Sequence, residues 1–250
     1  MTRFLLFGAA ALGAAVLIAQ QPALPPAAAG RGAALGRGRG PAVVAKPEEL
    51  ARIKAKSEEI EALVKELKAK HAEGTLIGDV DVFAKAGRFL IEYPDLFGTQ
   101  AAIDHSFAVL DSGIERGKQL LAGQSPWTTG KSRIYAYYSE IDGSVQPYHV
   151  SLPADYDAAK PTRLYVWMHG RQNNTTESEF MFNFMNPRPP APNAVVVADQ
   201  GQIQLDLFGR INSAGWHWAG EADVVEAIAA VKQRFKIDDK RIMLRGFSQG

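Results

Sequence analysis

A short apolar run near the C-terminus, Arg241 to Leu244, leads into Gly246-Phe247-Ser248-Gln249-Gly250. The combination of this run with the glycine-flanked serine constrains the fold more than any other feature of the sequence. A serine with glycines two positions before and after it suits a sharp turn between a strand and a helix, where backbone passes close on both sides. The five residues alone are a weak signal, but a strand precedes them and a helix precedes that strand. The sequence therefore predicts a serine hydroxyl presented at the end of a buried strand.

The residues from 131 onward predict an α/β fold with a mostly parallel sheet. The continuous apolar runs 164–168 and 194–198 are typical of strands buried on both faces. Glu221 to Phe235 is expected to be a helix, with one apolar stripe, acids at its start and bases at its end. The other expected features are a hairpin of strands 134–141 and 145–152 joined at Asp142-Gly143, an edge or bulge position for Pro147, and a turn at Asp238-Asp239.

Helices are expected before this region. Pro47 suits the first position of a helix, and apolar residues then recur at spacings of three, four and seven up to about Lys70. Two more helical segments follow at 80–91 and 101–121. We therefore divide the chain into a helical extension over 47–125 and an α/β domain over 131–250.

The N-terminus resembles an export signal. Arg3 is followed by an uncharged apolar run from Phe4 to Ala19, shorter than a membrane span requires. We expect residues 1–19 to be cleaved, residues 20–46 to be a disordered linker, and the protein to be secreted or periplasmic without stable insertion in a membrane. An uncleaved membrane anchor is the alternative.

Composition excludes several classes of protein. The net charge of +1 offers no field that would favour nucleic acid, so no nucleic-acid partner is expected. The chain contains no cysteine, which excludes disulfides, thiolate metal sites and a cysteine nucleophile. No cofactor and no metal site is expected from the remaining residues.

A second motif supports a site around Ser248. The predicted strand 164–168 ends in His169-Gly170-Arg171, and acyl transfer needs two backbone N–H donors to hold an oxyanion. In the nucleophile-elbow arrangement one donor follows the serine, here Gln249, and the other comes from a loop after an earlier strand, here Arg171. His169, Gly170, Gly246 and Gly250 would support these groups. A simple strand-to-loop turn at His169-Gly170 is the alternative.

The segment from Tyr148 to Gly250 resembles the first half of an α/β-hydrolase catalytic domain. It is most similar to exported esterases and to serine peptidases of the prolyl oligopeptidase family. The matching stretches are Val150 to Pro153 with Tyr156, Val166 to Gly170, Trp216 to Val225, and Lys236 to Gly250. The resemblance implies an α/β-hydrolase-type mostly parallel sheet, preceded by the helical extension, and an acyl-enzyme on Ser248 formed from a small ester or peptide substrate.

The order of the triad in that superfamily places the acid and the histidine after the serine. Only two residues follow Ser248, so the chain is expected to be a fragment that ends after the elbow and is inactive by itself. His217, between Trp216 and Trp218, is the best upstream stand-in for the base, although these three residues are expected to form a wall of the substrate pocket instead. His149 belongs to the hairpin, and His71 and His105 are expected to have surface or packing roles.

Two segments bordering the site, 171–193 and 199–220, are interpreted as loops. Their aromatic residues could line a pocket for an acyl or aryl group, or could only anchor the loops; these residues are Phe180, Phe182, Phe184, Phe208, Trp216 and Trp218. A non-catalytic exported binding module on a decayed hydrolase fold is the rival hypothesis. A helical adaptor built on the helix from Pro47 is a third hypothesis, and it does not account for the elbow.

Overall fold

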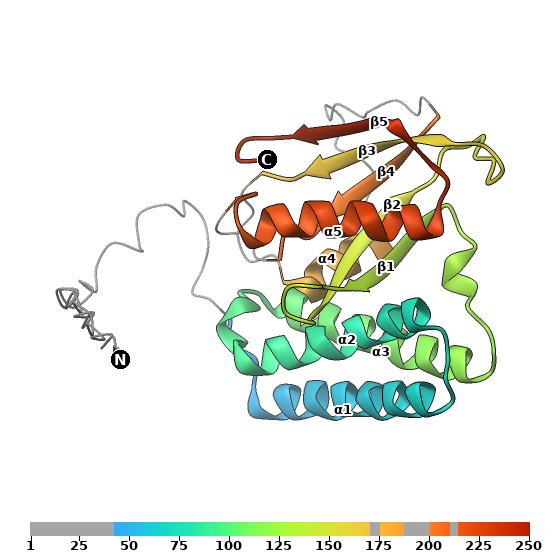
Figure 1. The fold of residues 1–250 in the computed structure, drawn as a ribbon. Helices are drawn as coiled ribbons and strands as arrows, with labels where there is room; N and C mark the ends of the chain where they lie inside the picture. The colour runs from blue at the N-terminus through green and yellow to red at the C-terminus, as the bar shows by residue number, and fades with distance from the viewer. Residues whose placement is uncertain (1–42, 171–175, 188–200, 211–214) are drawn as a thin grey trace, which may run out of the picture. The chain divides into compact units, whose positions relative to one another are not determined.

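The computed structural model describes residues 43–170, 176–187, 201–210 and 215–250 (Figure 1). The expected export signal, most of the expected linker, the apolar run 194–198 and Arg171 lie outside these residues. The helices are α1 (Pro47–Ala69), α2 (Gly74–Glu92), α3 (Gln100–Leu121), α4 (Glu177–Met185) and α5 (Ala219–Arg234). The strands are β1 (Ser132–Tyr138), β2 (Val145–Ser151), β3 (Thr162–Met168), β4 (Gln202–Leu207) and β5 (Ile237–Gly246).

The five strands form one sheet in the order β1-β2-β4-β3-β5. Because β1 and β4 both run antiparallel to β2, and β3 runs parallel to β4 and β5, four strands point the same way and only β2 is reversed. The fold class is therefore α/β with a mostly parallel sheet, as predicted. β3 and β5 are parallel neighbours, so their carboxyl ends, which carry the two candidate motifs, lie side by side at the same end of the sheet.

The predicted hairpin is confirmed, but the position expected for Pro147 is only partly correct. β2 lies inside the sheet, because β4 pairs with it from Tyr148 to Ser151. Pro147 pairs only with Ala136 of β1, just beyond the end of β4. Pro147 therefore lies where β2 pairs with β1 alone, so its missing N–H removes no hydrogen bond between β2 and β4.

Two elements lie in segments that the sequence suggested were loops. β4 lies in the segment 199–220, and its residues Gln-Ile-Gln-Leu-Asp-Leu alternate between polar and apolar as in a half-buried strand. α4 lies in the segment 171–193 and begins after Thr176, whose hydroxyl accepts a hydrogen bond from Glu179 N–H (3.1 Å). Phe180 and Met181 of α4 are buried in the core.

The turn expected at Asp238-Asp239 is an irregularity within β5. The pairing with β3 jumps from Thr162↔Ile237 to Leu164↔Ile242. Asp238 bridges the irregular stretch by accepting from Lys240 N–H (3.0 Å) and from Arg241 Nε (2.6 Å). The extra residues thus bulge out without ending the strand.

The expected helices near the N-terminus are confirmed as α1, α2 and α3, which pack on one another. The apolar stripe of α1 is buried, and α3 approaches the other two helices closely at a glycine. A Cβ atom at Gly113 would lie 2.4 Å from Phe83 Cβ and 2.9 Å from Ile60 Cδ1, so no larger residue fits without moving a helix. The assignment of 47–125 as a separate extension stays a prediction.

Helices cover the two faces of the sheet. Side chains alternate along β1: Ile134 and Ala136 join the apolar core shared with α1 to α4, whereas Tyr135 and Tyr137 join the core shared with α5. Figure 1 shows α5 lying along one face and the N-terminal helices beyond β1. Of the helices in the described residues, none is long and apolar enough to cross a membrane.

Candidate functional site

The predicted elbow forms a sharp bend at the end of β5. Ser248 comes two residues after the strand, its φ is +59°, and its side chain is exposed. A positive φ costs a non-glycine residue conformational energy and concentrates at functional sites. The serine is therefore presented to solvent from a strained turn, as in a nucleophile elbow. The strand before it is not buried as predicted, because β5 lies at the edge of the sheet, where Met243 and Leu244 are 49% and 54% exposed.

The two glycines of the motif are required by the closeness of the backbone. A Cβ atom at Gly246 would lie 2.3 Å from the carbonyl carbon of Gly250. One at Gly250 would lie 2.1 Å from the carbonyl oxygen of Met168, at the end of β3. No side chain fits at either position unless the turn opens.

The structure brings the His169-Gly170 motif against the elbow. The N–H of Phe247 donates to the carbonyl oxygen of Met168 (3.2 Å). A Cβ atom at Gly170 would lie 3.1 Å from Ser248 Cβ and 3.0 Å from Phe247 O. The backbone after β3 thus passes directly beside the serine, although Arg171, one of the two expected oxyanion donors, lies outside the described residues.

His169 holds the end of β3 in place. Its side chain is buried, with Nδ1 2.8 Å from Gly170 O and Nε2 3.1 Å from Phe208 O. Its own carbonyl oxygen accepts a hydrogen bond from Trp216 Nε1 (2.9 Å). Because both ring nitrogens face carbonyl oxygens, His169 supports the site and does not face Ser248 as a base.

The expected pocket residues Trp216, His217 and Trp218 lie in different surroundings. Trp216 is partly buried on Gly209, whereas Trp218 is 82% exposed. His217 is exposed, and a Cβ atom at Gly215 would lie 3.7 Å from both His217 Cδ2 and Gln249 O, so the histidine lies beside the elbow. Within the described part of the chain, no hydrogen bond joins the Ser248 hydroxyl to a histidine or a carboxylate.

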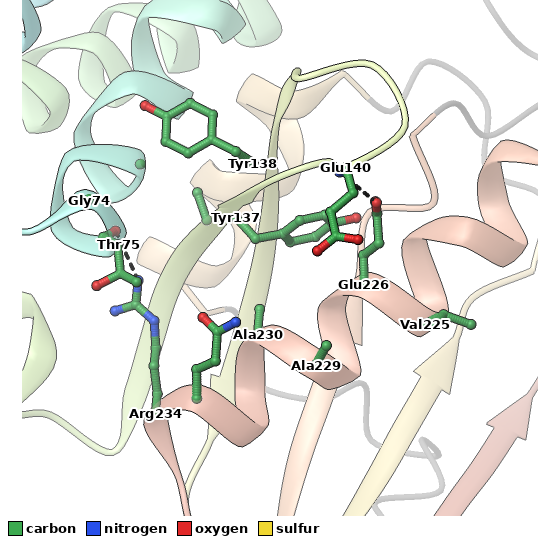
Figure 2. A pocket seen from close by; sticks show the side chains of 13 residues that line it. Gly74, Thr75, Tyr137, Tyr138, Glu140, Val225, Glu226, Ala229, Ala230 and Arg234 are labelled. Atoms are coloured by element: carbon green, nitrogen blue, oxygen red, sulfur yellow. Dashed lines mark hydrogen bonds between the residues drawn. The ribbon is translucent and has the colours of Figure 1, made fainter.

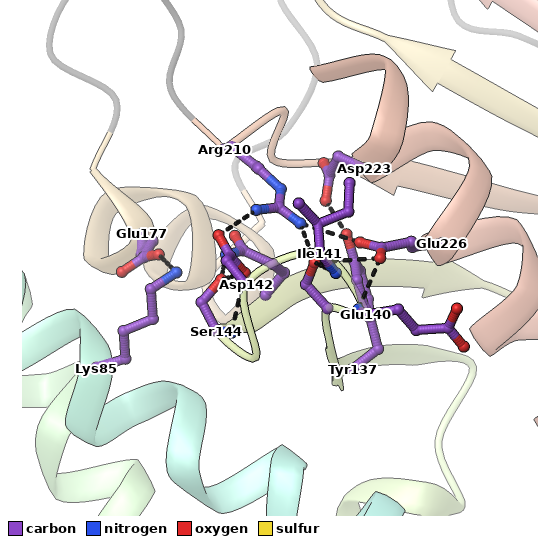
Figure 3. Close-up of polar contacts among 12 residues, drawn as sticks. Lys85, Tyr137, Glu140, Ile141, Asp142, Ser144, Glu177, Arg210, Asp223 and Glu226 are labelled. Atoms are coloured by element: carbon purple, nitrogen blue, oxygen red, sulfur yellow. Dashed lines mark hydrogen bonds and ion pairs between the residues drawn. The ribbon is translucent and has the colours of Figure 1, made fainter. Parts of the chain in front are cut away.

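A buried polar network, which the sequence analysis missed, supports the segment before α5 (Figure 3). The Asp223 carboxylate accepts from Gly209 N–H (2.7 Å) and from the Tyr137 hydroxyl. Burial raises the pKa of Asp223, and burial beside Asp223 raises the pKa of Tyr137. The Trp216 indole packs on Gly209, so Asp223 fixes the backbone against which the indole lies while it donates to the His169 carbonyl oxygen.

Arg210 extends this network to the hairpin. Its guanidinium pairs with Asp142 (2.8 Å) and Glu226 (3.0 Å), which joins the turn between β1 and β2 to α5. Hydrogen bonds from the Ser144 hydroxyl and N–H, together with Arg210, lower the pKa of Asp142 to about 2. The signal for the network was Asp223 itself, an acid on the apolar stripe of the predicted helix 221–235.

Cavities in the described part of the chain lie apart from the elbow. One of about 410 Å³ lies between α2, β1 and α5, and Figure 2 shows Arg234 reaching the Thr75 carbonyl oxygen at one side and Glu226 bonded to Glu140 N–H at the other. None of its lining residues belongs to the elbow or to the His169-Gly170 motif. A second cavity of about 190 Å³ is lined by Trp167, His169, Phe180, Asn183, Phe184, Asp206 and Leu207.

The aromatic residues of the segment 171–193 are packed in part around this second cavity. Phe180 and Phe184 line it, while Phe182 stacks on His105 with ring centroids 3.6 Å apart. Phe182 thus anchors the segment, whereas a pocket for an acyl or aryl group stays a prediction, because the cavity lined by Phe180 and Phe184 includes no elbow residue. In the described ranges, no group of three or more His, Cys, Asp or Glu side chains could hold a metal ion.

Comparison with known proteins gives similarity only among solved structures. No family model matches the chain, and no curated protein matches it. A thermostable esterase is 17% identical with a TM-score of 0.34, over 48% of this chain and 35% of the esterase. A putative dipeptidyl aminopeptidase IV from Bacteroides ovatus is 16% identical with a TM-score of 0.33, over 50% of this chain and 19% of that protein.

A ferulic acid esterase from Anaeromyces mucronatus is 15% identical with a TM-score of 0.30, over 47% of this chain and 49% of the esterase. The chain thus spans less than half the length of each of these three structures. Their activities belong to those proteins.

Proposed function

We propose that this protein is a serine hydrolase that cleaves an ester or peptide bond through an acyl-enzyme on Ser248. The observation that carries the proposal is the geometry of this residue: an exposed serine at φ +59°, at the end of a parallel strand, in contact with the backbone after β3. A hydroxyl held in this way can meet a carbonyl carbon while backbone donors on both sides face the developing oxyanion.

In the proposed reaction, Ser248 Oγ forms a bond to the substrate carbonyl carbon and loses its proton to a base. The N–H groups of Gln249 and Arg171 hold the oxyanion of the tetrahedral intermediate. The bond to the leaving alcohol or amine then breaks, the base returns the proton to that group, and water later hydrolyses the acyl-enzyme. The base is not assigned to any described residue, and an exported esterase or a prolyl oligopeptidase-type peptidase fits this chemistry equally well.

A fluorophosphonate probe tests the proposal. We expect the protein, produced from its own gene and host, to form a covalent adduct that peptide mapping places on Ser248, and Ser248→Ala to abolish that adduct. Ser112 on α3, whose hydroxyl only donates to the Ala108 carbonyl (3.0 Å), serves as a reference serine and should react far more slowly than Ser248. A folded protein with no adduct on Ser248 would refute the proposal and favour the non-catalytic binding module.

We further propose that residues 1–19 direct export and are removed, which places the protein outside the cytoplasm. The support is the short apolar run after Arg3, flanked by Gln20 and Pro22. N-terminal sequencing of the natural protein should find a first residue after Ala19. A mature protein that still begins at Met1 or Thr2 would contradict cleavage and favour a membrane anchor.

A further inference from the structure

We propose that Ser132, at the start of β1, is a second activated nucleophile with its own base and acid, and that it accepts acyl or phosphonyl groups from small activated electrophiles. Ser132 Oγ lies 2.8 Å from His149 Nε2, and His149 Nδ1 lies 2.9 Å from Asp206 Oδ2. A hydroxyl, an imidazole and a carboxylate connected in this order are the parts that nucleophilic catalysis by serine requires.

The partners of His149 fix the direction of its hydrogen bonds. An ionised carboxylate only accepts hydrogen bonds, so in the neutral imidazole Nδ1 carries the hydrogen and donates to Asp206. The lone pair of Nε2 then faces the Ser132 hydroxyl, which donates to it. The second oxygen of Asp206 accepts from Gln204 Nε2 (3.1 Å), which holds the carboxylate in place.

The base is held rigidly while the nucleophile is open to solvent. His149 and Asp206 are directly opposite each other in the pairing of β2 with β4, and the His149 ring is buried against Phe184 (centroids 3.9 Å apart, planes at 13°). Ser132 is exposed. An electrophile can therefore reach the hydroxyl without displacing the imidazole.

This group of three residues is separate from the elbow. Ser132 is on β1 at one edge of the sheet, and Ser248 follows β5 at the other edge. Four strand spacings of about 4.8 Å put these edges about 19 Å apart. His149 therefore serves Ser132 and cannot reach Ser248, and the proposal does not depend on the function proposed for Ser248.

The proposed step transfers one group and one proton. With a fluorophosphonate, Ser132 Oγ forms a bond to phosphorus, the phosphorus–fluorine bond breaks, and fluoride leaves with its electron pair. The hydroxyl proton passes to His149 Nε2, where the positive imidazolium is stabilised by Asp206. A purely structural role, in which the same bonds only satisfy a buried histidine, predicts ordinary reactivity for Ser132.

The test measures labelling of Ser132 by the fluorophosphonate probe in the Ser248→Ala protein. We expect Ser132 to react about 100-fold faster than the reference serine Ser112, the range that a positioned base provides. Asp206→Asn is the discriminating variant: the amide can donate to Nδ1, so that Nε2 carries the hydrogen and no longer accepts the serine proton. This change should remove most of the 100-fold advantage while circular dichroism shows the fold unchanged.

Heat denaturation provides a control that does not depend on any variant, because it should bring Ser132 and Ser112 to the same rate. Labelling of Ser132 at the Ser112 rate in the folded Ser248→Ala protein would overturn the proposal. Equal labelling of Ser132 with and without Asp206→Asn would do so too. Since adducts on Ser132 and Ser248 lie on different peptides, failure of one site is distinguished from failure of the other.

Discussion

Gly246→Ala is expected to lower the rate of probe labelling at Ser248 by at least about 100-fold. The added Cβ would lie 2.3 Å from the carbonyl carbon of Gly250 and 2.6 Å from its oxygen, and these are backbone atoms that no rotamer change can move. The turn must open, which displaces Ser248 from the backbone after β3. A misplacement of about 1 Å at a reacting group costs about 100-fold in rate.

The matched control is Gly74→Ala. Nothing lies within 4 Å of a Cβ at Gly74, so this substitution should leave labelling unchanged. Both variants are compared by labelling rate and by melting temperature. If Gly246→Ala labels Ser248 at the wild-type rate, then the tight turn is not needed to present the serine, and the argument from the elbow geometry fails.

The elements that the sequence predicted well are those in which local pattern and final environment agree. The apolar run 164–168 is found in β3, although only Leu164 and Val166 are fully buried, and the helix predicted over 221–235 is found at Ala219–Arg234. The nucleophile-elbow arrangement also predicted that the loop after β3 lies beside Ser248, and Gly170 of that loop is in contact with the serine. Arg171, the expected second oxyanion donor, lies outside the described residues, and its role stays a prediction.

The elements that were missed depend on contacts between distant segments. β4 carries Gln202, Gln204 and Asp206 on alternate positions, and such polar residues favour a loop until their partners are known. The partner of Asp206 is His149, 57 positions earlier in the chain. The group Ser132, His149 and Asp206 is assembled only by the register of β1, β2 and β4, which no local spacing in the sequence reveals.

The polar contacts between the helices and the sheet lead to the second large expected effect. Asp79→Ala should lower the free energy of unfolding by about 3–5 kcal/mol, the cost of removing one partner of a buried ion pair. Asp79 is fully buried on α2, and its carboxylate oxygens accept from both terminal nitrogens of Arg234 (2.9 and 3.0 Å). It also accepts from Trp127 Nε1 (3.1 Å) and Ala136 N–H (2.8 Å).

Removal of this carboxylate leaves an indole N–H and a backbone N–H of β1 without their acceptor, and leaves the guanidinium on α5 with the Thr75 carbonyl oxygen alone (3.0 Å). Burial raises the pKa of Asp79, whereas the charge of Arg234 and the hydrogen bonds from Trp127 and Ala136 oppose that shift and favour the carboxylate. Because Asp79 is the point where α2, β1 and α5 are joined, the loss should appear as a lower midpoint of urea denaturation.

Two further variants separate the contribution of charge to stability from the contribution of packing. Asp79→Leu combined with Arg234→Met removes both charges and should recover part of the lost stability, leaving the cost of the two unpaired N–H donors. Glu58→Ala breaks an exposed ion pair with Lys54 and should leave the midpoint within experimental error. If Asp79→Ala unfolds at the same urea concentration as Glu58→Ala, then the ion pair of Asp79 with Arg234 does not hold the helices to the sheet. That result would mean that water reaches both charges in the folded protein.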